Sequence, residues 1–326
     1  MKHVSILLPA GDVVVGSIEG PHKVLSQVND FLTGMGREPA FRVELVGLQK
    51  SQTFNKGLFT LHAARTIDED FQTDLIIIPA PHGNLAEAVA LNHAAIAWIN
   101  RQYAAGAEVA SLCLGAFLLA ATGLVDGRQC ATHWLGTNAF REMYPQVELV
   151  AEKVVTDAHG IYSSGGAYSY LNLMLYLVEK HVGRELAVLC AKVFQIDIGR
   201  HSQSPFAMFN GLKEHEDEPI KKVQQFIETN FQQRITVEEL ADLAYLSRRN
   251  FERRFKKATF NTAIEYIQRV KIEAAKMSLE TSRDNVNEVM YSVGYSDTKA
   301  FRSIFKKITG VSPLEYRNKY GKVLAA

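Results

Sequence analysis

The sequence predicts an α/β domain with a doubly wound parallel sheet, followed by an all-α domain that contains two helix-turn-helix motifs. Over the first two hundred residues, short β-branched runs alternate with amphipathic stretches, the pattern of parallel strands separated by helices. After residue 219 the apolar periodicity becomes helical, and two segments follow one plan about fifty residues apart. We therefore expect a first domain at 1–200, a polar linker at 201–218 and a second domain at 219–326.

Composition and charge narrow the class of protein. The 326 residues are 47% hydrophobic and carry a net charge of +1, but residues 1–218 sum to −7 and residues 219–326 to +8. This asymmetry favours a polyanionic partner for the second domain. Three cysteines are too few for a disulfide framework, which is typical of a reducing compartment, so we expect a cytoplasmic protein. We expect neither a signal peptide nor a membrane span.

The elements of the first domain are expected in order along the chain. Strands are expected at Val4–Leu8, at Phe41–Leu48 and at Asp74–Pro79, which is apolar on both faces like a central parallel strand. Leu85–Tyr103 has the periodicity of one continuous helix. Further strands are expected at Val147–Val150, Val154–Thr156 and Ile161–Ser163, and further helices at Tyr168–Val182 and Arg184–Phe194.

Between these elements, a short strand runs through Ser111 into a sharp turn at Cys113, and a helix follows over Gly115–Gly123. This is the geometry of a nucleophile elbow, which lifts the turn side chain above the sheet beside helix N-terminal amides that favour a thiolate. A cysteine in an apolar run is also often simple buried filling. The spacing alone leaves both interpretations open.

The segment ASLCLGAFLLAATGLVDGRQCATHW resembles the elbow and following helix of the ThiJ/PfpI branch of the class I glutamine amidotransferase-like fold. The resemblance extends over residues 3–190 and implies a flavodoxin-like sheet. It also implies that a cysteine, a histidine and a carboxylate meet near the elbow. Carried over to this sequence, these are Cys113, His133 and Glu19, with Asp12 as the rival carboxylate.

One departure from that family bears on catalysis. Enzymes of this fold often have a Gly-Gly pair after the third strand, whose backbone amides stabilise an oxyanion. Here the run is Pro79-Ala80-Pro81-His82-Gly83, and Pro81 has no N–H to donate. We therefore expect Cys113 and His133 to line a ligand pocket, and we expect the protein not to be an enzyme.

The second domain contains an internal repeat. Val237–Thr259 and Val286–Thr309 each begin with a short helix, turn tightly, and continue into a second helix with two phenylalanines at i, i+4. We expect Ser247 and Ser296 to cap the second helices, and Gly294 to supply the turn of the second copy. The phenylalanine spacing predicts core positions rather than base-stacking groups. Ala263–Leu279 is expected to be one helix joining the copies.

The exposed residues of the two second helices are the candidate DNA contacts. Residues on the early turns of such a helix reach base edges, and later cations reach phosphates. The early candidates are Arg248, Arg249, Asn250 and Arg253 in the first copy and Asp297, Thr298, Lys299 and Arg302 in the second. The phosphate candidates are Lys256, Lys257, Lys306 and Lys307.

The second domain resembles the AraC/XylS type of DNA-binding domain, most clearly at the run from Tyr291 to Asp297 and at the run from Thr309 to Arg317. With the first domain, the chain resembles the GlxA-type regulators. The resemblance implies a transcriptional regulator, more often an activator. Its partners would be double-stranded DNA, a small-molecule effector, a second copy in a homodimer and RNA polymerase.

Two alternatives rest on Cys113. It could serve a hydrolase or lyase that acts on a small amide, nitrile or aldehyde, or it could be a thiol redox sensor, each fused to the DNA reader. We expect no cofactor, and His82, His93 and His159 lack the spacing of metal ligands.

Overall fold

The computed structural model describes residues 1–213 and 215–321 and divides into two compact units, Met1–Gln203 and Ser204–Ala326. The segment expected as a linker, 201–218, is shared between them. Lys153 and Ser202 form an isolated antiparallel bridge inside the first unit, whereas 204–213 belong to the second. Glu214 lies outside the described residues.

The first unit is built on a seven-stranded sheet with the strand order β10-β11-β7-β6-β1-β2-β5. Its neighbouring strands run parallel, except for the antiparallel pair β10 and β11 at one edge. Its strands are β1 (Lys2–Leu8), β2 (Phe41–Gly47), β5 (Arg65–Thr66), β6 (Leu75–Ile78), β7 (Glu108–Leu112), β10 (Val155–Ala158) and β11 (Ile161–Ser164). Two short ladders lie outside this sheet: β3 (Ser51–Phe54) with β4 (Phe59–His62), and β8 (Gln129–Cys130) with β9 (Glu148–Leu149).

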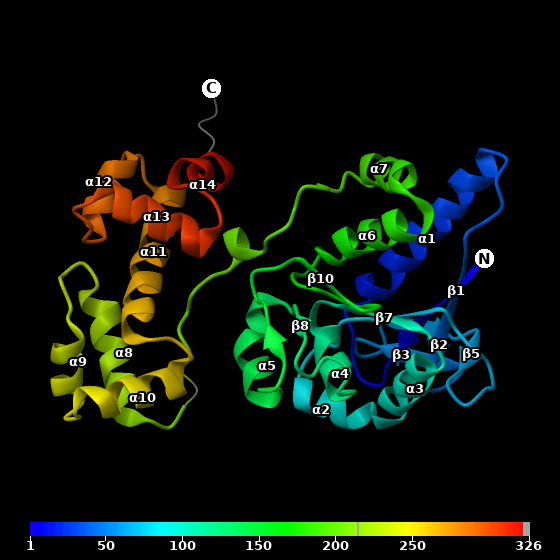
Figure 1. The fold of residues 1–326 in the computed structure, drawn as a ribbon, viewed down its shortest axis with the longest axis horizontal. Helices are drawn as coiled ribbons and strands as arrows, with labels where there is room; N and C mark the ends of the chain where they lie inside the picture. Colours follow the sequence, from blue (N-terminus) through cyan, green and yellow to red (C-terminus); the bar gives the residue numbers. More distant parts are fainter. Residues whose placement is uncertain (214, 322–326) are drawn as a thin grey trace. The chain divides into compact units, whose positions relative to one another are not determined.

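Helices cover both faces of the sheet (Figure 1), which confirms the predicted doubly wound architecture. One face packs against α1 (Gly16–Gly34), α6 (Tyr170–Val182) and α7 (Arg184–Val193). The other packs against α2 (Leu85–Leu91), α3 (His93–Ala104), α4 (Ala116–Ala121) and α5 (Thr137–Met143). Because side chains alternate along a strand, Ile6 of β1 lies in the first core and Leu7 in the second.

The prediction of one helix over Leu85–Tyr103 is wrong, because the chain breaks at Asn92 into α2 and α3. Asn92 is fully buried, and its side chain both donates to the Ala10 carbonyl at 2.9 Å and accepts from the Ala10 amide at 2.8 Å. The break therefore places Asn92 where it provides hydrogen-bond partners for the backbone of the loop after β1. The apolar periodicity of the segment does not reveal this contact.

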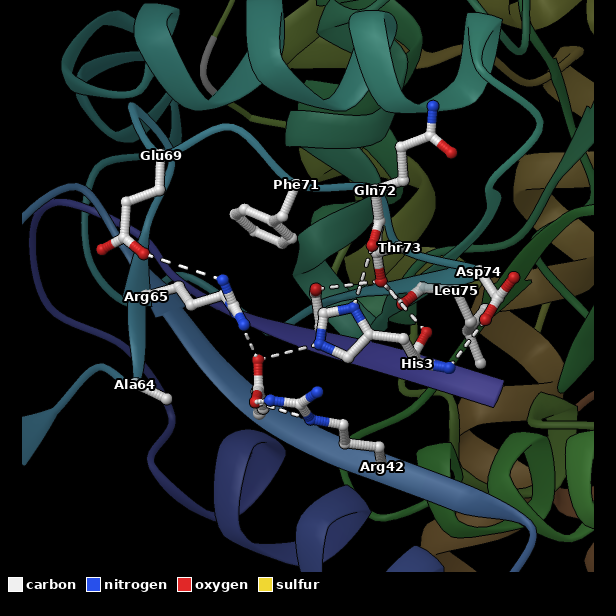
Figure 2. A network of polar contacts seen from close by, with 12 residues as sticks. His3, Arg42, Ala64, Arg65, Glu69, Phe71, Gln72, Thr73, Asp74 and Leu75 are labelled. Atoms are coloured by element: carbon white, nitrogen blue, oxygen red, sulfur yellow. Dashed lines mark hydrogen bonds and ion pairs between the residues drawn. The ribbon is translucent and has the colours of Figure 1, made fainter. Parts of the chain in front are cut away.

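A network of polar side chains joins β1, β2 and β5 near one edge of the sheet (Figure 2). His3 approaches the Gln72 carbonyl through Nδ1 at 3.1 Å and Glu44 through Nε2 at 2.9 Å. Arg65 and Arg42 also donate to the Glu44 carboxylate, at 2.8 and 2.9 Å. Burial alone would raise the pKa of Glu44, but the hydrogen bonds from Arg65, His3 and Arg42 lower it to about 2.

The second unit is helical and has two hydrophobic cores that share one helix, α11 (Ala263–Thr281). Tyr266, near the start of α11, lies in the first core, and Leu279, near its end, lies in the second. The other helices are α8 (Glu218–Asn230), α9 (Val237–Leu243), α10 (Arg248–Thr259), α12 (Val286–Ser292), α13 (Thr298–Thr309) and α14 (Pro313–Tyr320). The four repeat phenylalanines are fully buried, which confirms their predicted core role: Phe251, Phe255, Phe301 and Phe305.

The residue that caps the second helix of the second copy differs from the prediction; the second helices of the two copies, α10 and α13, are called the recognition helices below. Ser247 holds the N-cap position of α10 as expected, but its side chain makes no capping hydrogen bond. The N-cap of α13 is Asp297 rather than Ser296, and its carboxylate accepts a hydrogen bond from the Ala300 amide at 2.6 Å. Ser296 lies five residues before Phe301, whereas Ser247 lies four residues before Phe251. The cap at Asp297 therefore gives both copies the same spacing between the cap and the first phenylalanine.

In each copy, one residue of the turn has a left-handed backbone conformation. Gly294 supplies it in the second copy, with φ of 75°, as predicted. In the first copy the position is taken by Tyr245, with φ of 55° and a side chain that is 95% exposed. A side chain in this region of backbone space is strained, which glycine avoids.

Residues 204–213 lie along α11. Within residues 204–213, only the short 3-10 turn Ser204–Phe206 is helical. Lys276 donates to the Ala207 carbonyl at 2.7 Å, and Glu273 accepts from the Phe209 amide at 3.1 Å.

Candidate nucleic-acid interface and cysteine elbow

The first turns of α10 carry four of the predicted DNA contacts, and their side chains differ in how they are engaged. Arg248 is exposed but forms ion pairs with Glu238 and, at 3.2 Å, with Glu252. Arg253 donates to the Asn250 side chain at 2.9 Å, which orients both groups. Arg249 is exposed on the second residue of the helix.

The first turns of α13 carry the remaining early candidates. Lys299 and Arg302 are exposed, and Thr298 is half-buried at the first helical position. The Asp297 carboxylate caps the helix, so its hydrogen bond to Ala300 competes with any contact to a base. Lys299 and Arg302 are therefore the residues of this helix best placed to carry positive charge toward a ligand.

The phosphate candidates occupy the last turns of the same helices. Lys256 and Lys257 of α10 and Lys306 and Lys307 of α13 are exposed. Cations at these positions also stabilise the helix, because they offset the partial negative charge of its C-terminus. Each recognition helix thus presents cations at both of its ends.

A buried lysine that the sequence reasoning missed joins the turn of the second copy to the segment after α8. Lys271 of α11 is 8% exposed and donates to the Gly294 carbonyl at 3.1 Å and, more weakly, to the Gln233 carbonyl at 3.5 Å. Burial lowers its pKa. A Cβ at Gly294 would lie 2.1 Å from the Gln232 carbonyl oxygen, so the turn of the second copy packs directly on the segment after α8. Lys271 and Gly294 thus tie the second copy to the segment that precedes the first.

The elbow has the predicted geometry. β7 ends at Leu112, a 3-10 turn spans Cys113–Gly115, and α4 begins at Ala116. Cys113 has φ of 55°, the left-handed conformation of a sharp strand-to-helix turn. A Cβ on Gly115 would lie 2.6 Å from the Ile78 carbonyl oxygen and 2.7 Å from that of Pro79, so only glycine allows α4 to approach the end of β6 this closely.

The environment of Cys113 does not favour a thiolate. The side chain is buried, and burial raises the pKa of the thiol to about 11 despite a hydrogen bond from the Leu114 backbone. Thr132 donates to the Cys113 carbonyl at 3.2 Å and so links the elbow to the loop before His133.

The structure does not join the three predicted pocket residues into one network. His133 Nδ1 accepts a hydrogen bond from the Leu135 amide at 3.1 Å, and burial lowers the pKa of its ring. Glu19 is exposed on α1, and Asp12 accepts from the Asn55 amide at 2.6 Å. Within the described ranges no hydrogen bond or ion pair connects Cys113, His133 and Glu19.

The backbone amides near the elbow are engaged elsewhere. The Ala80 amide donates to Ser17 Oγ at 2.9 Å, and the His82 amide donates to the Asp12 carbonyl at 2.8 Å. Pro81, between them, has no N–H. The Ala80 and His82 amides are therefore not free to donate to an oxyanion.

The described residues contain neither a metal-binding cluster nor a membrane-spanning helix. No group of three or more His, Cys, Asp or Glu side chains there could hold a metal ion. None of the helices in that part of the chain has the length and apolarity needed to cross a lipid bilayer.

Comparison with known protein families matches both units. Residues 7–180 match the DJ-1/PfpI family, and residues 240–319 match a helix-turn-helix domain. The crystal structure named "putative transcriptional regulator protein from Vibrio parahaemolyticus" aligns with a TM-score of 0.52 and 22% identity. It covers 59% of this chain and 98% of its own. That likeness shows the fold of the first unit.

Curated relatives align over both units. The HTH-type transcriptional regulator GbdR of Pseudomonas aeruginosa is 26% identical over 68% of this chain and 60% of its own length. The HTH-type transcriptional regulator GlxA of Rhizobium meliloti is 24% identical over 66% of this chain and 67% of its own. The chain thus spans about 60% of the length of GbdR.

Proposed function

The chain belongs to the DJ-1/PfpI family and carries an AraC-type helix-turn-helix region, and we propose from this that it is a sequence-specific DNA-binding regulator of transcription. The proposal rests on the two helix-turn-helix copies that share α11, each of which presents exposed cations on its second helix. The names of GbdR and GlxA as transcriptional regulators agree with it.

In this proposal, each recognition helix contacts bases through its first turns and phosphates through its last turn. Arg249 and Arg302 lie on early turns, where an arginine can pair with guanine in the major groove. Lys256 and Lys306 lie on the last turns, where a lysine reaches phosphate. The helix between the two copies, α11, has 19 residues. At 1.5 Å per residue its length is about 28 Å, which is comparable with the roughly 34 Å of one duplex turn.

The first unit would supply regulation in this proposal. We assign it a small-molecule effector and self-association into a homodimer, and we propose that the protein acts as an activator in contact with RNA polymerase. Sedimentation equilibrium of the full chain tests the dimer. In vitro transcription from a bound promoter tests the activator role, and a fall in transcript on adding the protein would instead mean repression.

DNA binding is tested with the full chain. Selection from random duplexes should first yield a preferred site. On that site, Arg249→Ala and Arg302→Ala should each weaken binding by about 1–3 kcal/mol, with little change on random DNA. Lys256→Ala should weaken binding to the preferred site and to random DNA equally, and it should reduce the salt dependence of the binding constant. Arg101→Ala removes an exposed helical arginine of the first unit and should change neither.

Two outcomes would contradict the proposal. One is that selection yields no preferred sequence. The other is that Arg101→Ala weakens binding as much as the two recognition-helix variants do.

The elbow at Cys113 is the one observation that favours a second function, either a cysteine hydrolase or lyase or a redox sensor. The buried thiol with its raised pKa and the engaged amides of Ala80 and His82 weaken that candidate. A pocket role for Cys113 and His133 agrees better with these contacts.

A further inference from the structure

The segment 206–212, called the strap below, runs along α11 between the two hydrophobic cores of the second unit. At its start, the Phe206 ring lies edge to face against the ring of Tyr320 in α14, with ring centres 6.2 Å apart. Tyr320 packs against the second core. At its end, Gln224 of α8 donates to the Leu212 carbonyl at 2.8 Å, and α8 contributes to the first core. The strap therefore links the core of the second copy to that of the first.

The backbone in the middle of the strap is held by two side chains of α11. Lys276 donates to the Ala207 carbonyl at 2.7 Å, and Glu273 accepts from the Phe209 amide at 3.1 Å. Lys276 is 3% exposed and also forms an ion pair with Glu273 at 2.8 Å. Hydrogen bonds in which one partner is ionised are stronger than those between neutral groups. One ion pair thus fixes two backbone groups of the strap.

Phe209 is the side chain that anchors the strap on the first core. Its ring lies edge to face against Tyr266, with ring centres 5.0 Å apart, and the Arg269 guanidinium lies 5.7 Å from the ring centre. Tyr266 is fully buried in the first core. Two residues after Phe209, Gly211 has φ of 64°, and a Cβ there would lie 2.3 Å from the Tyr266 hydroxyl oxygen. The strap therefore approaches Tyr266 as closely as a glycine allows.

The residue that ends the first unit is itself held in place. Gln203 is 2% exposed, and its side chain donates to the Thr132 carbonyl at 2.8 Å and accepts from the Trp134 amide at 3.2 Å. The Thr132 hydroxyl in turn donates to the Cys113 carbonyl at 3.2 Å. Because only two residues separate Gln203 from the strap, a displacement of the loop 132–134 acts on the strap through the chain itself.

We propose that the strap is a regulatory device: docked on α11, it holds the two copies in the orientation that binds DNA, and its release lowers DNA affinity. The strap contacts the second core through Phe206 and the first through Phe209, so docking restricts how the two cores move along α11. A reader that is ordered in advance loses less conformational entropy on binding. The loop 132–134 controls docking through Gln203. The effect on DNA affinity rests on the proposed function.

Hydrogen–deuterium exchange of the full chain tests docking of the strap without DNA. Phe209→Ala should speed exchange of the amides of residues 207–212 by about tenfold, because the ring that anchors the strap is lost. Met208→Ala is the matched control, because this neighbouring side chain is 55% exposed, and it should change exchange by less than about twofold. Equal exchange of the strap in the two variants would overturn the proposal.

Binding of the full chain to its preferred DNA site tests the regulatory role. Phe209→Ala should weaken binding by about tenfold, and Met208→Ala should leave it unchanged. Phe209→Tyr keeps the ring and should restore most of the affinity. Gln203→Ala should speed exchange of the strap and weaken DNA binding, although the changed residue lies in the first unit.

Unchanged or tighter DNA binding by a Phe209→Ala chain whose strap exchanges freely would overturn the regulatory role. If circular dichroism shows that Phe209→Ala does not fold, Gly211→Ala replaces it, because its added Cβ displaces the strap from Tyr266 without changing a core side chain. Absence of any preferred DNA site for the unmodified chain would refute the proposed function, and with it the regulatory role. The exchange experiment, which needs no DNA, would still decide whether the strap docks.

Discussion

The side-chain ammonium of Lys271 lies 3.1 Å from the backbone carbonyl oxygen of Gly294 and fastens α11 to the turn of the second helix-turn-helix. The same ammonium approaches the Gln233 carbonyl of the segment after α8. One buried cation thus joins the turn of the second copy to the segment between α8 and α9.

Replacing Lys271 by methionine should destabilise the second unit by about 1–3 kcal/mol, because it removes the hydrogen bond that the buried ammonium donates to the Gly294 carbonyl. Urea unfolding of the full chain measures this change. Lys222→Met, on the exposed surface of α8, serves as the control and should shift stability by less than about 0.5 kcal/mol. Equal effects of the two variants would contradict the bridging role of Lys271.

The two turn residues predict opposite effects of substitution. Tyr245→Gly should stabilise the protein by about 0.5–1 kcal/mol, because it relieves a left-handed side chain that is 95% exposed. Gly294→Ala should destabilise it by more than about 1 kcal/mol, because the added Cβ would lie 2.1 Å from the Gln232 carbonyl oxygen. Thermal unfolding of both variants tests the pair, and the same sign for both would be the contrary result.

Glu44 should make stability depend on pH in the acid range. Its pKa is lowered from 4.5 to about 2 in the folded protein, so its contribution is complete above pH 4.5 and is lost as the pH falls toward 2. Glu44→Gln should reduce stability at pH 7 by on the order of 1–2 kcal/mol after solvent screening, and by less at pH 3. Urea unfolding at the two pH values measures this. Glu38→Gln, exposed before β2, should show no such dependence.

Cys113 should react slowly with iodoacetamide at neutral pH, because its pKa of about 11 leaves the buried thiol protonated. The rate in the folded protein should rise about tenfold for each pH unit up to about pH 10. Peptide mass spectrometry after timed alkylation follows Cys113 separately from Cys130 and Cys190. A rate that levels off near pH 8 would show a reactive thiol and restore the enzyme and redox alternatives.

Patterns carried by local spacing predicted the fold well. The phenylalanines at i, i+4 and the strand-turn-helix run around Cys113 each depend on neighbours in sequence, and both occur as predicted. Asn92 breaks a helix because of Ala10, far away along the chain, so no local pattern could show it.

Three features of the candidate sites differ from the prediction or were not predicted, each for its own reason. Lys271 resembles a solvent-facing residue until the fold brings the Gly294 and Gln233 carbonyls to it. The cap at Asp297 could have been found, because aligning the copies on their phenylalanines places it opposite Ser247. The meeting of Cys113, His133 and Glu19 was an implication of resemblance alone, and the contacts of these residues do not join them.

The shared helix α11 sets a limit on the DNA that this protein could read. Since both copies pack on the single helix α11, we expect their separation not to stretch to follow the duplex. Adding a single base pair between the two half-sites would displace the second by about 3.4 Å and rotate it by roughly 35°. A site of this kind should therefore tolerate substitutions at its centre but not a change in its spacing.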